Sequence, residues 1–330
     1  MTRKVSVDIA KGIGISLVVL GHMNDYFGAN IPRTYSFIYL FHVPLFFFLS
    51  GLFFREKEGF GDCLKKKFYR LYVPYLLANI FFFAVEMIRA RLMGSAYDGT
   101  ISWGDLFYAS FGLWPVLSML SRPTWFILIL FRIFIIYKLL QLVFKINKLL
   151  MLSVCVLAGV FGAFFPIEKF MIGQTLAALP FFSLGHVCTA EFIDNQKVFS
   201  TINCVIIGIV SAAAAYFISI FQMTNIAVNV YGNVPLYFTG AILGIMMVIS
   251  VSKLLENWAA AAKSLSFIGK YTLPILIWHI FVIKVLFTIV EKGLGISGGA
   301  ILCIVAFFIG ILVPIGLSLV YKKKMQSWIA

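Results

Sequence analysis

The stretch VSVDIAKGIGISLVVLGHMND, residues 5–25, is long and apolar enough to cross a bilayer as a helix, yet it contains ionisable residues. Lys11 and His22 are eleven positions apart, so at 3.6 residues per turn they lie within about 20° of one helix face and about 16 Å apart along the axis. Asp8 comes three positions before Lys11, on the same side. Because ionisable groups inside a membrane mark functional sites by default, the sequence predicts a site on this face.

The whole composition indicates a polytopic membrane protein. The chain has 330 residues, of which 62% are hydrophobic and 12% charged, whereas soluble domains have about 25% charged residues. The predicted spans are 6–24, 36–54, 71–89, 124–144, 149–166, 172–190, 200–221, 232–252, 271–290 and 299–321. We therefore expect an all-α fold of about ten transmembrane helices, forming one membrane domain over residues 1–330 with no appended soluble domain.

Lys and Arg residues between these spans lie mainly on the side that holds both termini, including the clusters at 65–70 and 322–324. This bias predicts that both termini are cytoplasmic, with Asp8 and Lys11 near the inner end of the first helix and His22 near its outer end. The net charge of +14 is explained by such loops, so no nucleic-acid partner is expected. The five cysteines include no Cys-x-x-Cys pair, so neither a disulfide framework nor a metal site is expected.

Two more ionisable residues inside spans are candidates for substrate binding. His42 precedes Pro44 in the outer half of its span and could face His22, although a packing role is equally open. Arg132 lies inside the fourth span, on the same helix face as Trp125, where a guanidinium is costly unless it faces a polar cavity. We interpret Arg132 as a residue that faces such a cavity and binds a substrate there. The longer segment 90–123, with Trp103 and Trp114, is interpreted as an interfacial loop or short helix.

Several short motifs occur in a fixed order along the chain. A Lys-x10-His helix is followed by FHVPLFFFLSG (41–51), KKKFYRLYVPY (65–75), TWFILILF (124–131) and YTLPILIWHI (271–280). In this order the motifs resemble the acyltransferase-3 family of integral membrane acyltransferases, and most closely its branch of sugar and fucose O-acetylases. The resemblance implies transfer of an acyl group, usually acetyl, from cytoplasmic acyl-CoA to a sugar hydroxyl outside.

The resemblance also implies roles for individual residues. Lys11 and His22 occupy the positions of the family's first-helix motif, whose His is taken to be essential. Lys67 and Arg70 match a pair of basic residues three apart, although Lys replaces the commoner Arg at position 67 and lacks its bidentate grip. We expect this pair to bind the phosphates of acetyl-CoA, which serves as a co-substrate, with no tightly bound cofactor.

The chemistry of His22 has two open forms. It can act as the general base that takes the proton of the acceptor hydroxyl, or it can carry the acyl group covalently. Lys11 either contacts the donor or neutralises Asp8, and Asp8 supports the site. The expected partners are acyl-CoA, a glycan or lipid-linked saccharide and the lipid bilayer, at a bacterial plasma membrane.

A transporter or flippase is the main alternative. Such a protein would bury the same ionisable residues, including Arg132, as a proton or substrate path. The sequence has no evident internal repeat, which counts against a transporter built from repeated halves. A sensor or structural membrane protein without activity is a third possibility, and the filled Lys11, His22 and Arg70 positions count against it.

Overall fold

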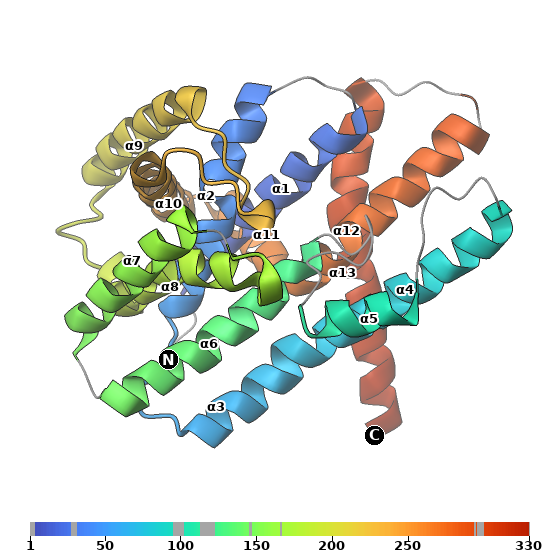
Figure 1. The fold of residues 1–330 in the computed structure, drawn as a ribbon. Helices are drawn as coiled ribbons and strands as arrows, with labels where there is room; N and C mark the ends of the chain where they lie inside the picture. The colour runs from blue at the N-terminus through green and yellow to red at the C-terminus, as the bar shows by residue number, and fades with distance from the viewer. Residues whose placement is uncertain are drawn as a thin grey trace. The chain divides into compact units, whose positions relative to one another are not determined.

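The computed structural model describes residues 4–27, 32–94, 102–112, 123–144, 147–165, 167–293, 295 and 300–329. The structure is 87% helical, and the described residues contain no strand, so the expected all-α class is confirmed. Figure 1 shows the ribbon with its helix labels. The chain divides into two compact units: unit 1 comprises residues 1–46, 190–224 and 235–330, and unit 2 comprises residues 47–189 and 225–234.

The α-helices are α1 (Val5–Phe27), α2 (Pro32–Gly51), α3 (Phe60–Lys67), α4 (Val73–Met93), α5 (Trp103–Ser110), α6 (Trp125–Phe144), α7 (Lys148–Phe164), α8 (Ile172–Ile193), α9 (Thr201–Phe221), α10 (Val234–Glu256), α11 (Ala259–Lys270), α12 (Thr272–Phe287) and α13 (Ala300–Ile329). Two π-helical turns, η1 (Phe68–Tyr72) and η6 (Thr288–Gly293), follow α3 and α12. Short 3₁₀ turns lie at Lys169–Met171 and Ile226–Val228.

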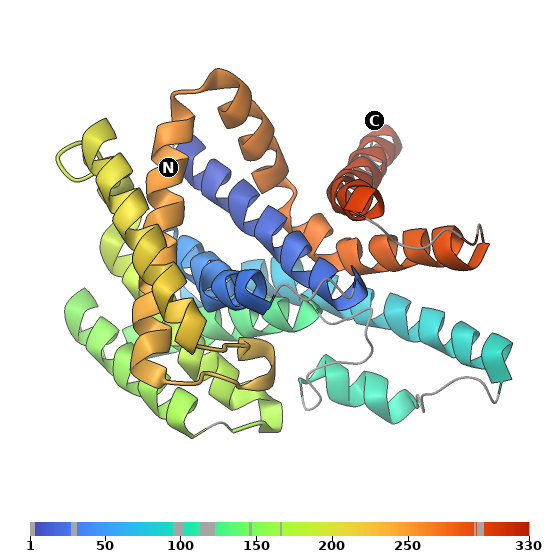
Figure 2. The same cartoon turned by 90° about the horizontal axis from the view of Figure 1, so that it is seen from above.

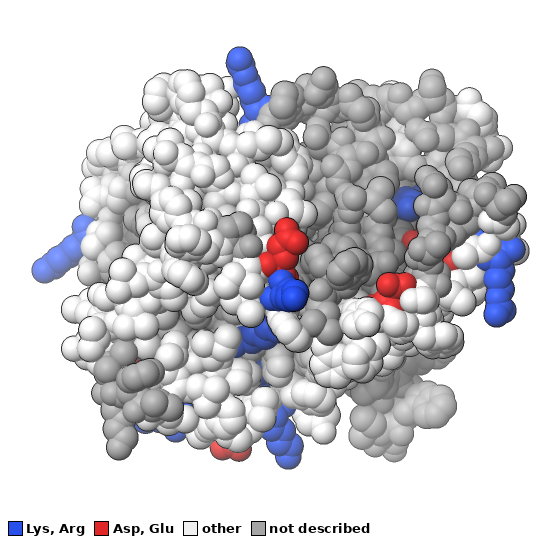
Figure 3. Space-filling model, in the orientation of Figure 1, with Lys and Arg blue, Asp and Glu red and all other residues white. Residues whose placement is uncertain are grey.

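Nine of the described helical segments are long and apolar enough to cross a membrane, and they coincide with nine of the ten predicted spans. The tenth prediction, 149–166, corresponds to α7, which is apolar but has only 17 residues. Many large apolar side chains face outward, for example Ile202 and Ile209 on α9. The described residues on the face shown in Figure 3 are mostly uncharged, as lipid contact requires. The protein is a multi-pass membrane protein.

The predicted orientation of the termini stays a prediction. Several cations on which it depends, among them Arg3, Arg122 and Lys145, lie outside the described residues, as do the side chains of residues 322–324. Of the predicted interfacial segment, α5 forms a short helix with the exposed Trp103 at its start, and Ser102 and Asp105 cap it reciprocally. Trp114 also lies outside the described residues.

Within unit 1, α1 packs chiefly along α11 and also against α12 and α13. Two glycines make the contact close: a Cβ added to Gly12 would overlap the backbone carbonyl of Leu265, and one added to Gly269 would overlap the carbonyl of Asp8. Small residues allow helix backbones to approach in this way inside membranes. Figure 2 shows α1 in dark blue, seen along its length, and α13 in red, seen nearly along its axis. These contacts hold α1, which contains Asp8, Lys11 and His22, against the C-terminal helices of unit 1.

Within unit 2, α3, η1 and α4 follow one another without a break, and α3 and η1 pack against α6. The π-helical turn at Phe68–Tyr72 begins directly after Lys67 and contains Arg70. Such turns are rare and often occur at functional sites, because the wider turn changes the direction of the side chains it carries. Lys67 and Arg70 therefore lie where the chain changes from α-helix to a π-helical turn.

Candidate functional site

The three ionisable residues of the first motif lie on α1, as predicted. The Nζ atom of Lys11 is 3.7 Å from Oδ1 of Asp8, and the Asp8 residue is only 8% exposed. An ion pair of this kind allows a carboxylate and an ammonium to coexist in a membrane helix. The pair shows the charge balance that we considered for Lys11, while contact of Lys11 with a donor stays a prediction.

His22 belongs to a cluster of rings from three helices of unit 1. Its ring centre lies 5.3 Å from that of His279 on α12 and 6.4 Å from that of Tyr39 on α2. Tyr39 in turn lies 4.7 Å from the ring of His42, centre to centre. The predicted site residues His22 and His42 are therefore joined through Tyr39, and His279 is brought to His22 as well.

Hydrogen bonds fix the tautomers of two of these histidines. Nδ1 of His279 donates to the carbonyl oxygens of Ile275 and Leu276, at 2.8 and 3.0 Å. Nδ1 of His42 donates to the carbonyl oxygen of Ile38 at 2.8 Å. Because a carbonyl oxygen only accepts, Nδ1 carries the proton in both rings, and Nε2 holds a lone pair when the ring is neutral.

His279 is the residue that the sequence reasoning did not assign. His279 lies in the motif YTLPILIWHI, which contributes to the family resemblance but predicts no role for this histidine. Helical periodicity relates residues on one helix, whereas His22 and His279 lie on helices far apart in the chain. The available signal was a second histidine inside a span, since such residues are rare and usually face the bundle interior.

The predicted donor-binding pair lies in unit 2. The Nζ atom of Lys67 is 3.3 Å from the ring centre of Phe134 on α6, and this lysine is half-buried. This cation–π contact positions the ammonium without neutralising its charge. Arg70 lies on the π-helical turn with its side chain exposed. The two cations therefore belong to one helical segment, where one is positioned by a ring and the other is accessible.

Arg132 on α6 ties together two segments of unit 2. One of its NH groups donates to the carbonyl oxygen of Phe170, and the other donates to that of Phe111 at 2.6 Å. Such hydrogen bonds to carbonyl oxygens partly offset the free-energy cost of placing a guanidinium inside a membrane span. The substrate-binding role predicted for Arg132 is untested by this geometry and stays a prediction.

A hydrogen-bonded chain anchors the loop that leads into the basic helix α3. His186 pairs through Nε2 with the carboxylate of Glu56 at 2.9 Å, and its Nδ1 lies 2.9 Å from the hydroxyl of Tyr137. Lys148 also contacts that carboxylate at 2.9 Å, and the buried Lys138 donates to the backbone carbonyl of Glu56 at 2.6 Å. The hydrogen bond from Lys148, helped by His186, holds the pKa of Glu56 below its usual range. This network holds the loop that precedes α3, the helix that ends at Lys67.

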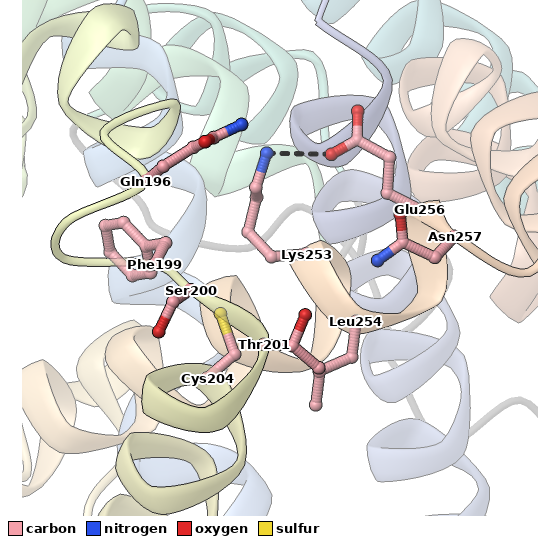
Figure 4. A pocket seen from close by; sticks show the side chains of 9 residues that line it. All are labelled: Gln196, Phe199, Ser200, Thr201, Cys204, Lys253, Leu254, Glu256 and Asn257. Carbon is pink, nitrogen blue, oxygen red and sulfur yellow. Dashed lines mark hydrogen bonds and ion pairs between the residues drawn. The ribbon is translucent and has the colours of Figure 1, made fainter.

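A pocket of about 390 Å³ opens between the start of α9 and the end of α10 in unit 1. Its lining is mostly polar. Figure 4 shows Lys253 paired with Glu256, with 2.8 Å between Nζ of the lysine and Oε2 of the glutamate. Desolvation raises the pKa of nearby Asp194, but Lys4 and Lys253 outweigh it and leave that pKa below its usual range. None of the predicted site residues lines this pocket, so it is separate from the histidine cluster.

Comparison with known proteins gives one match. A family model described as "Acyltransferase domain" matches residues 4–320, nearly the whole chain. No curated protein and no solved structure matches significantly. Among the described residues, no group of three or more His, Cys, Asp or Glu side chains could hold a metal ion.

Proposed function

Because the chain belongs to the acyltransferase-3 family, we propose that it is a membrane O-acetyltransferase, which moves the acetyl group of cytoplasmic acetyl-CoA to a hydroxyl of an extracytoplasmic or lipid-linked sugar. Family membership makes the protein a membrane acyltransferase. The observation that carries the finer proposal is the pairing of the family's Lys-x10-His helix with a ring cluster around His22. The proposed location is a bacterial plasma membrane.

His22 has the role of general base in this proposal. Its lone-pair nitrogen takes the proton of the acceptor hydroxyl while that oxygen attacks the thioester carbonyl. The new C–O ester bond forms as the C–S bond breaks, and the departing CoA thiolate takes up the proton from His22. The ring contacts of His22 with His279 and Tyr39 support this role, because they position the imidazole among the helices of unit 1.

Lys67 and Arg70 are proposed to bind the phosphates of the donor. Coenzyme A carries several phosphate charges, and cationic side chains recognise such groups through charge-assisted hydrogen bonds. The half-buried ammonium of Lys67 and the exposed guanidinium of Arg70 suit this role, since both charges remain available to a ligand. Lys11, supported by Asp8, is proposed to contact the donor. His42 is proposed to bind the acceptor, and Arg132 is proposed to bind either the acceptor or the anionic donor.

The test is transfer of label from [14C]acetyl-CoA to glycan in native membranes that contain the wild-type chain or His22→Ala. We expect the wild type to label glycan and His22→Ala to lose the label at a normal protein level. Label on the protein itself would instead indicate an acyl-histidine route. A transporter gains nothing from acetyl-CoA, so failure of the purified protein to bind it would favour that alternative.

A further inference from the structure

The Nε2 atom of His279 is a buried acceptor that is not satisfied within the described part of the chain. His279 is 0% exposed, and Nδ1 is occupied by the two carbonyl oxygens of its own helix. Nε2 therefore holds the lone pair, and among the described residues it has no hydrogen-bond partner. Buried polar atoms are nearly always hydrogen-bonded, so an exception of this kind calls for a partner from outside.

The position of His279 indicates what that partner is. Its ring lies 5.3 Å from the ring of His22, centre to centre, and both belong to unit 1. A group that satisfies Nε2 must donate a hydrogen bond, and an acceptor molecule held at His22 brings hydroxyl groups, which are donors. The hydroxyl that is acylated gives its proton to His22, so a second hydroxyl is the natural partner for His279.

We propose that His279 is an acceptor-binding residue whose Nε2 accepts a hydrogen bond from the hydroxyl adjacent to the one that His22 deprotonates. This inference rests on the function proposed above. It assigns the acceptor to the class of sugars and polyols that carry two neighbouring hydroxyl groups. Adjacent hydroxyls on a sugar ring lie close enough together to meet two imidazoles whose rings are in contact.

The two histidines have different roles in this arrangement. The hydroxyl at His22 loses its proton and becomes the ester oxygen as the thioester C–S bond breaks. The hydroxyl at His279 keeps its proton and only donates a hydrogen bond, so no bond to it forms or breaks. The backbone carbonyls of Ile275 and Leu276 keep Nδ1 protonated, which keeps Nε2 of the neutral ring an acceptor. An acceptor without the second hydroxyl would leave Nε2 unsatisfied and would be discriminated against.

Two substitutions separate the proposed role from simple packing. In His279→Asn the amide nitrogen occupies the place of Nδ1 and can donate to Ile275, but the acceptor at Nε2 is gone. In His279→Gln the side-chain amide reaches the place of Nε2 and can accept through its oxygen. The matched control is Thr272→Val on the same helix, which removes the 2.8 Å hydrogen bond from Oγ1 to the carbonyl of Gly269.

The assay uses native membranes that contain each variant at matched protein level and measures initial transfer from [14C]acetyl-CoA to glycan. We expect His279→Asn to reduce the rate roughly tenfold to a hundredfold, His279→Gln to retain more, and Thr272→Val to match the wild type. Affinity of the purified His279→Asn protein for acetyl-CoA should equal that of the wild type. In the isolated product, NMR should place the ester beside a free hydroxyl.

Three results would overturn the inference while leaving the proposed function intact. They are full activity of His279→Asn, loss of acetyl-CoA affinity in that variant, which would show a structural role, and an ester with no free hydroxyl beside it. Absence of label with the wild type, or full labelling with His22→Ala, would instead contradict the proposed function, and the inference would fall with it.

Discussion

Lys11 lies 3.7 Å from the carboxylate of Asp8, which comes three residues earlier on α1, and the two side chains differ in exposure. The side chain of Asp8 is 11% exposed and that of Lys11 31%, so the acid is the more deeply buried partner. Removing the cation leaves that acid in a poorly solvated place, whereas removing the acid leaves a lysine that can still reach solvent. This asymmetry allows the two proposed roles of Lys11 to be separated.

The first prediction compares Lys11→Met, Asp8→Asn and the double variant. We expect Lys11→Met to lower the free energy of unfolding by about 1 kcal/mol and the double variant to regain most of that loss, because it also removes the carboxylate that had paired with Lys11. Acetyl-CoA affinity should stay reduced in the double variant if Lys11 contacts the donor. Thermal unfolding in detergent and equilibrium binding measure the two effects separately. Recovery of full affinity in the double variant would leave Lys11 with charge balance alone.

The second prediction concerns Lys67 and its contact with Phe134. We expect Lys67→Ala to weaken acetyl-CoA binding about tenfold, through loss of a charge-assisted contact to phosphate. Lys67→Arg should bind at least as well as the wild type, since a guanidinium also stacks on rings and grips phosphate with two donors. The control is Lys65→Ala, which removes an exposed cation nearby. An equal loss with Lys65→Ala would point to general electrostatic attraction in place of a defined contact.

The third prediction tests the close approach of α1 and α11. We expect Gly269→Ala to destabilise the protein by about 1–3 kcal/mol, because its Cβ would overlap the carbonyl of Asp8 and push the helices apart. The matched control is Gly316→Ala on α13, where an added Cβ meets nothing within 4 Å. Thermal unfolding in detergent compares the two. Similar unfolding temperatures for both variants would contradict the predicted contact.

The fourth prediction is a pH dependence at Glu56, whose pKa lies below its ordinary value of 4.5. A carboxyl with a lowered pKa in the folded state stabilises the fold above its ordinary pKa, and this stabilisation is lost as the pH falls through the lowered value. Glu56→Gln should therefore lose less stability than the wild type on acidification from about pH 6 to about pH 3. Because the side chain is 42% exposed, the difference should stay below about 1 kcal/mol.

Lys148→Met serves as the partner variant for this experiment. It removes the largest cause of the lowered pKa, so it should flatten the same part of the stability profile. Stability measured against pH by thermal unfolding in detergent covers all three proteins. If the stability of the wild type changed with pH in the same way as that of both variants, the ion pair between Glu56 and Lys148 would make no contribution to stability.

The spans and the stripe on α1 could be predicted because both depend on order within one helix. Hydropathy over about 20 residues locates a span, and the helical period places Asp8, Lys11 and His22 on one face. Among the described helices, α7 is the one predicted span that is too short to be a candidate for crossing the membrane, with 17 residues. The orientation of the termini and the roles of the site residues stay predictions.

The contacts that complete the candidate site join distant parts of the chain, so no local pattern encodes them. His279 reaches His22, Phe134 reaches Lys67, and Glu56 reaches His186 only after the helices pack. The π-helical turn at Phe68–Tyr72 is also a feature that we did not predict from the sequence. The sequence alone predicts candidate site residues, and the packing of the helices shows which of them lie together.

The pairing of α1 with α11 also has a consequence for biosynthesis. Residues 5–27 leave the ribosome long before residues 259–270, so α1 must enter the bilayer without the helix that it packs against. The ion pair between Asp8 and Lys11 lies within α1 itself and can form at that stage. His279 can contact His22 only after α12 has been made. The cluster of rings around His22 is therefore complete only near the end of translation.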